Sequence, residues 1–129
     1  MGTLNVLARG LLICLMASMA GAGESTIKVT GIYSDMKYNR EGGDVLGTEI
    51  FVVFSKQGYC VVFQSAEGEP NVPVVVQASI SEGKIFFEIP PGIDPRGRFS
   101  GEITKDELIG SFSANGHVVR LKRKTSYWQ

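Results

Sequence analysis

The feature that most constrains the fold is an alternation of apolar and polar residues that begins at Ile27 and continues almost to the end of the chain. Apolar residues recur at every second position far more often than at helical spacing, and a glycine or proline interrupts the chain about every ten residues. No segment longer than a turn or two has helical periodicity. The pattern predicts an all-β domain.

Turn signals divide this region into eight expected strands. Asn115-Gly116 is a strong hairpin signal of the type I′ kind, and residues 81–83 form a similar Ser-Glu-Gly turn. Because such short turns pair each strand with its sequence neighbour, we expect an antiparallel up-and-down meander that closes into a barrel, with an open β-sandwich as the alternative. The expected strands are Ile27–Ser34, Leu46–Ser55, Tyr59–Ser65, Pro73–Ser79, Lys84–Ile89, Arg98–Ile103, Glu107–Ser113 and His117–Lys124.

The expected inner face of this barrel is crowded. Gly101 and Gly110 lie at the same level of two adjacent strands, where glycine usually marks strong coiling or close approach of another group. An eight-stranded barrel is just wide enough for side chains to fill, so crowding argues against a large cavity. The residues expected to point inward are Phe51, Val53, Val61, Phe63, Ile85, Phe87, Phe99 and Phe112.

Residues 1–22 are typical of a secretory signal peptide. One positive charge at Arg9 precedes a short apolar run, and Ala20-Gly21-Ala22 fits the small-residue cleavage rule. We expect cleavage before Gly23, or alternatively after Ala20, and a soluble exported domain of residues 23–129 without a transmembrane segment. A lipid on Cys14 is the alternative, but Ile13 stands where lipoprotein signals place a small residue.

The exported part carries a formal charge of about -1, because Arg9 leaves with the signal and all 13 acidic residues remain. Such a balance provides no field that would favour nucleic acid. Cys60 is the single remaining cysteine, which excludes an internal disulfide. It lies in an apolar run, so we expect a buried, inert core residue, with an intermolecular disulfide as the alternative.

No constellation for catalysis, metal or cofactor binding is apparent. His117 is the single histidine, at the exit of a turn, and its combination with Cys60 as a catalytic dyad is a remote alternative. One histidine and one cysteine do not suffice for a usual zinc site, and Glu67 and Glu69 are typical of a solvated turn. The longer links, 35–45 and 90–97, are the ones expected to differ in role from plain connectors.

The last strand is the most distinctive surface feature. Alternation places Arg120, Lys122 and Lys124 on one outer stripe, which favours an anionic partner or, more simply, protects an edge strand from mispairing. Arg123 falls in the inward set, where it either extends outward at a barrel end or pairs with a carboxylate, and in a pocket it would suit an acidic ligand. Tyr127 and Trp128 follow, and we expect this tail to pack onto the barrel and close one end, or alternatively to act as a recognition tag.

The layout of signal peptide, Gly31-Ile32-Tyr33 opening strand, hairpin meander and basic last strand resembles small secreted barrels of the calycin kind, such as avidins and lipocalins. Tyr33 stands where lipocalins have tryptophan, and the avidin pocket has no counterpart at the residue level. Residues 121–129 also resemble uncharacterised exported proteins of Gram-negative bacteria. The resemblance implies a barrel and an exported, periplasmic or secreted protein, and no activity.

Two hypotheses for function follow. The first is a non-enzymatic binding module that holds an apolar or amphipathic small ligand at the barrel mouth. The second is a protein-binding module, such as an inhibitor of a secreted hydrolase, which acts through loops and the basic stripe on an anionic protein. The candidate binding residues are Arg120, Lys122, Arg123, Lys124, Tyr127 and Trp128. An enzyme ranks last, and no cofactor is expected.

Overall fold

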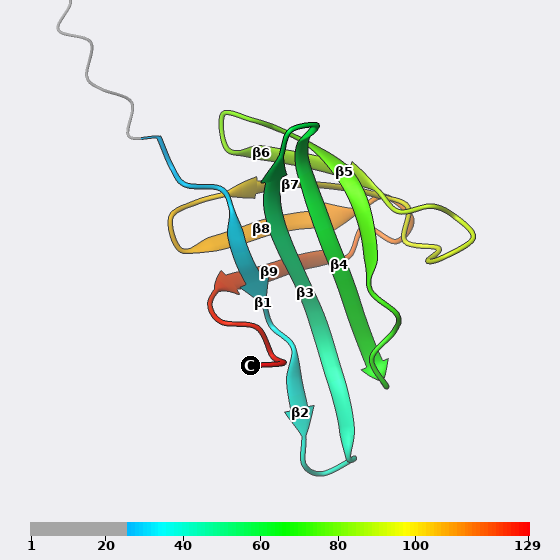
Figure 1. Cartoon of the computed structure of the whole chain (residues 1–129). Coiled ribbons are helices and arrows are strands. Elements are labelled where there is room, and N and C mark those ends of the chain that lie inside the picture. Colours follow the sequence, from blue (N-terminus) through cyan, green and yellow to red (C-terminus); the bar gives the residue numbers. More distant parts are fainter. Residues whose placement is uncertain (1–25) are drawn as a thin grey trace, which may run out of the picture.

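The computed structural model describes residues 26–129, which form an all-β structure of nine strands (Figure 1). The expected signal peptide, including Cys14, lies outside these residues. The strands are β1 (Gly31–Ser34), β2 (Lys37–Asn39), β3 (Asp44–Ser55), β4 (Gly58–Gly68), β5 (Val74–Ser81), β6 (Lys84–Glu88), β7 (Arg98–Ile103), β8 (Glu107–Phe112) and β9 (Val118–Arg123).

Eight of the strands close into an antiparallel barrel. From β3 to β9 each strand pairs with its sequence neighbour, and β1 pairs with both β3 and β9 and thereby completes the ring. β2 pairs with β3 and runs beside the part of β3 that extends below the other strands in Figure 1. The expected meander and its closure are therefore confirmed, and the open sandwich is excluded.

The interior is filled by side chains. Four phenylalanine rings form its centre, and the Phe87 and Phe99 rings stack with centroids 4.9 Å apart. Gly101 and Gly110 face each other, as expected, and a Cβ at Gly110 would lie 2.3 Å from the Phe99 ring. The two glycines therefore make room for an aromatic ring. The buried cluster contains Tyr33, Ile50, Val52, Val61, Phe63, Ile85, Phe87, Ile89, Phe99, Ile103, Leu108, Phe112, Val119 and Leu121.

The expected orientation of β3 is wrong by one residue. Ile50 and Val52 point inward and are fully buried, whereas Phe51 is 39% exposed and Val53 lies on the same outer face. Residues 50–54 are all apolar, so alternation gives no phase for this strand. The other six expected inward residues, from Val61 to Phe112, are buried.

Two expected element boundaries also change. The link 35–45 contains the short strand β2 and a tight turn in which Gly43 has φ of +70°. The first barrel strand begins at Gly31 rather than Ile27, and residues 26–30 run outside any strand. The Asn115-Gly116 hairpin forms, but only Gly116 has positive φ, so the turn is not of type I′.

Cys60 is not a core residue. It lies opposite Val53 and Gln77 on the outer face of β4, with a half-exposed side chain 4.0 Å from the Ser55 hydroxyl. The apolar run around it has the same ambiguity as β3, because both of its faces are apolar.

Candidate functional site

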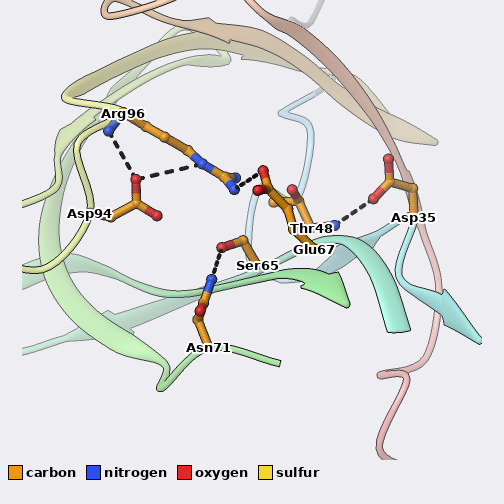
Figure 2. A network of polar contacts seen from close by, with 7 residues as sticks. All are labelled: Asp35, Thr48, Ser65, Glu67, Asn71, Asp94 and Arg96. Atoms are coloured by element: carbon orange, nitrogen blue, oxygen red, sulfur yellow. Dashed lines mark hydrogen bonds and ion pairs between the residues drawn. The ribbon is translucent and has the colours of Figure 1, made fainter. Parts of the chain in front are cut away.

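One end of the barrel, which we call the mouth, gathers most of the interior polar groups. Arg96 extends across it from the 90–97 loop between β6 and β7 (Figure 2). The guanidinium carbon lies 5.9 Å from the centre of the Phe63 ring and 5.8 Å from that of Phe112. Arg96 therefore caps the aromatic interior with a cation–π contact to two rings. The segments that connect the strands at this end are 35–43, 69–73, 89–97 and 113–117.

Two carboxylates of unequal exposure hold Arg96. The Asp94 Oδ1 accepts from the Arg96 backbone amide at 2.9 Å and lies 3.5 Å from its Nε, and the Asp94 side chain is 12% exposed. Glu67 at the end of β4 accepts from Nη2 at 3.0 Å, but its side chain is 80% exposed. Asp94 thus fixes the arginine within its own loop, whereas Glu67 contributes a solvated and exchangeable contact.

A second polar group enters the mouth from β3. The Thr48 amide donates to the Asp35 Oδ1 at 2.6 Å, and the Asp35 amide donates back to the Thr48 carbonyl. Gly47 permits this crossing, because a Cβ there would lie 2.7 Å from both the carbonyl and Oδ1 of Asp35. Asp35 is thereby held beside Thr48 at the rim of the barrel.

Thr48 is a buried residue whose hydroxyl has no hydrogen-bond partner within the described residues. The residue is 5% exposed and points inward opposite Ser65, whose own hydroxyl accepts from the Asn71 amide at 2.9 Å. No hydrogen bond reaches the Thr48 hydroxyl from residues 26–129, and no fully enclosed side-chain oxygen in this range lacks a partner. The hydroxyl therefore faces space that a ligand or water can reach.

That space is a cavity of about 320 Å³ at the mouth. Its lining combines charged, polar and apolar side chains. A recess of about 560 Å³ adjoins it and shares Glu67, Arg96 and Asn115 with it. The cavity is lined by Asp35, Leu46, Gly47, Thr48, Ala66, Glu67, Arg96, Phe112, Asn115, His117 and Val119.

The opposite end, which we call the base, is closed by a different arginine. Arg123 donates from Nη1 to the Thr30 carbonyl at 2.7 Å, from Nε to the Lys105 carbonyl at 3.0 Å, and from Nη2 to the Lys28 carbonyl. Its Nη2 also donates to the Tyr33 hydroxyl at 2.6 Å. Of the two alternatives for Arg123, pairing with a carboxylate does not occur within the described residues, because main-chain oxygens and a phenol accept its hydrogen bonds at this barrel end.

Tyr33 completes the base. Its ring is fully buried with the Arg123 guanidinium 4.7 Å above it, and its hydroxyl donates to the Val29 carbonyl at 2.7 Å. Burial raises the pKa of Tyr33 above the usual 10.0, and the nearby Arg123 charge offsets part of that rise. Two of the features on which the calycin-like resemblance rests, the Gly-x-Tyr strand and the basic last strand, meet at this contact.

The basic stripe lies where alternation places it, on the outer face of β9. Arg120 forms an ion pair with Glu107 of β8 at 2.7 Å, so one of the three positive charges of the stripe is neutralised. Lys122 and Lys124 are exposed and form no ion pair within the described residues.

The C-terminal tail packs on the outer wall rather than across a barrel end. Glu49 of β3 accepts from the Ser126 hydroxyl and, at 2.8 Å, from the Tyr127 amide. Trp128 donates from its indole to Gln64 of β4 at 2.8 Å. Beside the tail lies an outer groove of about 460 Å³ with an apolar floor. Its apolar lining residues are Ile32, Phe51, Val62, Pro73 and Trp128.

The remaining candidates stay apart. Cys60 lies on the outer wall and His117 at the mouth, so the structure does not assemble the dyad. Within residues 26–129 no cluster of three or more His, Cys, Asp or Glu side chains could hold a metal. In the same range there is no helix with the length and hydropathy to cross a membrane.

Sequence reasoning missed Arg96, Asp94 and Thr48. The available signal was the 90–97 link itself, because an Asp-Pro-Arg sequence in a long loop indicates a fixed side chain more than a plain connector. Thr48 gave no signal, because a single threonine between Gly47 and Glu49 looks like any strand residue.

Comparison with known proteins adds no family to this description: no family model matches the chain, and neither the curated proteins nor the solved structures include a match.

Proposed function

We propose that the protein is an exported, non-enzymatic binding module that holds a small ligand at the mouth of its barrel. The observation that carries the proposal is the Thr48 hydroxyl, which belongs to a buried residue in the lining of the mouth cavity and has no hydrogen-bond partner within the described residues. A ligand in the cavity would supply the hydrogen bond that these residues do not provide. The filled interior leaves the mouth as the place for such a ligand.

The cavity has the composition of a small-molecule site. Its volume of about 320 Å³ lies at the lower end of the usual range for ligand pockets. Phe112 and Val119 supply apolar wall, and a few polar groups converge on the same space. The Arg96 guanidinium is positioned before any ligand arrives, because its Nε pairs with Asp94 and its plane lies near two phenyl rings.

Native mass spectrometry of the protein purified from its own cell envelope tests this proposal. We expect a complex whose added mass disappears on denaturation and is reduced in Thr48→Val, which removes the hydroxyl and keeps the shape. Thr30→Val at the base is the matched control and should retain the ligand. A wild-type protein that always carries its unliganded mass would contradict the proposal.

A second candidate is a protein-binding module, and the outer groove beside the tail favours it. The partner would be an acidic protein with one apolar anchor, because the groove is mainly apolar and two lysines without an ion pair in the described residues lie beside β1: Lys122 of β9 and Lys124 just after it. Charge complementarity of this kind selects partners and accelerates their association.

The two candidates separate in one capture experiment from a cell-envelope extract. A protein identified by mass spectrometry should be lost with Lys122→Glu/Lys124→Glu and retained with Thr48→Val. Capture that survives the lysine reversals would exclude binding through this surface.

A further inference from the structure

We infer that the ligand of the mouth is a small amphipathic organic cation whose primary ammonium group lies between Asp35, Glu67 and the Thr48 hydroxyl. The inference rests on the proposed function, because it names the ligand class of that same site. Three independent features of the mouth support it: its net charge, the cation that it already holds, and the layout of its polar and apolar walls.

The formal charge of the mouth favours a cation. Asp35 and Glu67 line the cavity with Arg96, and Asp94 forms an ion pair with Arg96, so the mouth contains three carboxylates and one guanidinium. Lys and Arg side chains other than Arg96 do not line the cavity. An anionic ligand would gain one arginine and meet a surplus of negative charge, whereas a cation gains from the same surplus.

The mouth already holds one cation, from its own chain. Arg96 lies over two phenyl rings with a carboxylate on each side, an arrangement that suits organic cations in general. The hydrogen bonds of Asp35 and Glu67 in the described residues use one oxygen of each carboxylate, Oδ1 and Oε1. One oxygen on each side of the cavity therefore remains available to a second cation.

The Thr48 hydroxyl provides the third acceptor. A primary ammonium has three donors, and the cavity lining contains the Thr48 hydroxyl together with the Asp35 and Glu67 carboxylates (Figure 2). Leu46, Phe112 and Val119 form the apolar part of the lining, which an alkyl or aryl body can cover. Within residues 26–129 no three His, Cys, Asp or Glu side chains gather in a way that could hold a metal ion. An organic cation therefore fits the acceptors of the cavity better than a metal ion.

Amide chemical shifts of the purified protein test the inference with three probes of one length: hexylammonium, hexanol and hexanoate. We expect hexylammonium to shift the Thr48 and Arg96 amides saturably, with a Kd about tenfold or more below those of hexanol and hexanoate. Asp35→Asn and Glu67→Gln should each weaken hexylammonium about fivefold or more. Glu69→Gln, an exposed carboxylate two residues from Glu67, is the matched control and should have no effect.

Two results overturn the inference, and they bear differently on the proposed function. Hexanoate binding at the same amides more tightly than hexylammonium would refute the cation and leave the mouth as the binding site. Hexylammonium shifts that are insensitive to both Asp35→Asn and Glu67→Gln, or no shift from any probe, would refute the assigned recognition groups. The proposed function is then judged separately by the mass of the natural complex.

Discussion

The two ends of the barrel are each closed by one arginine that lies over an aromatic ring, but the partners of the two arginines differ. At the base, Arg123 is held by three main-chain carbonyls and the Tyr33 hydroxyl. At the mouth, Arg96 is held by two carboxylates, one of them largely exposed.

The difference separates structure from recognition. Main-chain carbonyls are fixed by the fold and cannot turn away, so removing Arg123 takes a charged donor from three of them and from the Tyr33 hydroxyl. Side-chain carboxylates can turn into solvent, and Glu67 loses little when its contact breaks. The base arginine is therefore part of the closed barrel, and the mouth arginine belongs to a surface that can exchange partners.

The largest effect is expected from Arg123→Met, which keeps the apolar stem and removes the donors. The free energy of unfolding should fall by about 3 kcal/mol, because four oxygens lose a charged donor. Urea unfolding measures the change. Arg98→Met, in an exposed pair with Glu88, is the control and should cost less than about 0.5 kcal/mol. Equal losses for both variants would remove the distinction.

Arg96→Met should cost about 1 kcal/mol, clearly less than Arg123→Met. Most of this loss of unfolding free energy comes from Asp94, which is 12% exposed and would lose its cation. Glu67 contributes little, because its side chain is 80% exposed and already solvated. The same urea titration provides the value. If Arg96→Met proves as costly as Arg123→Met, the mouth is as rigid a closure as the base.

Tyr33→Phe should change how stability depends on pH at the base. Because burial raises the Tyr33 pKa, the folded state keeps a proton that the unfolded state loses above about pH 10. The free energy of unfolding should therefore fall as pH rises past 10, and Tyr33→Phe should flatten this fall while costing about 1 kcal/mol at neutral pH. Tyr38→Phe, an exposed tyrosine, should retain the wild-type slope.

The smallest effect is expected from Thr48→Val at the mouth. Its hydroxyl has no partner in the described residues, so stability should change by less than about 0.5 kcal/mol even though the residue is buried. Thermal unfolding without ligand measures this. A loss near that of Tyr33→Phe would show that the hydroxyl serves the fold rather than a ligand.

Much of the fold follows from the sequence because alternation and turn chemistry act locally. Asn115-Gly116 and the Ser81–Gly83 turn mark hairpins. Once consecutive hairpins are recognised, the open question is whether the meander closes into a barrel or stays open as a sandwich. Which face of β3 points inward could not be predicted from the sequence, because residues 50–54 are apolar on both faces. β2 does not follow either, because Lys-Tyr-Asn is too short and polar to show a pattern.

The site follows from the sequence much less. Glu67 could be noted as a carboxylate near a turn, but its partner Arg96 is 29 residues away and reaches it only across the barrel. The role of Arg123 depends on contacts more than 90 residues away along the chain. Such pairings are products of closure, and no local pattern encodes them.

The pairing of β1 with β9 also means that the barrel can close only after β9 has been synthesised. β1 leaves the ribosome well before residues 118–123, which provide its partner strand β9 and the arginine that secures the base. Until residues 118–123 are made, the outer edge of β1 has no strand to pair with, and such an edge invites pairing with other chains. A chain without residues 118–123 would therefore be an open sheet with unpaired edges on β1 and β8, and such edges favour aggregation.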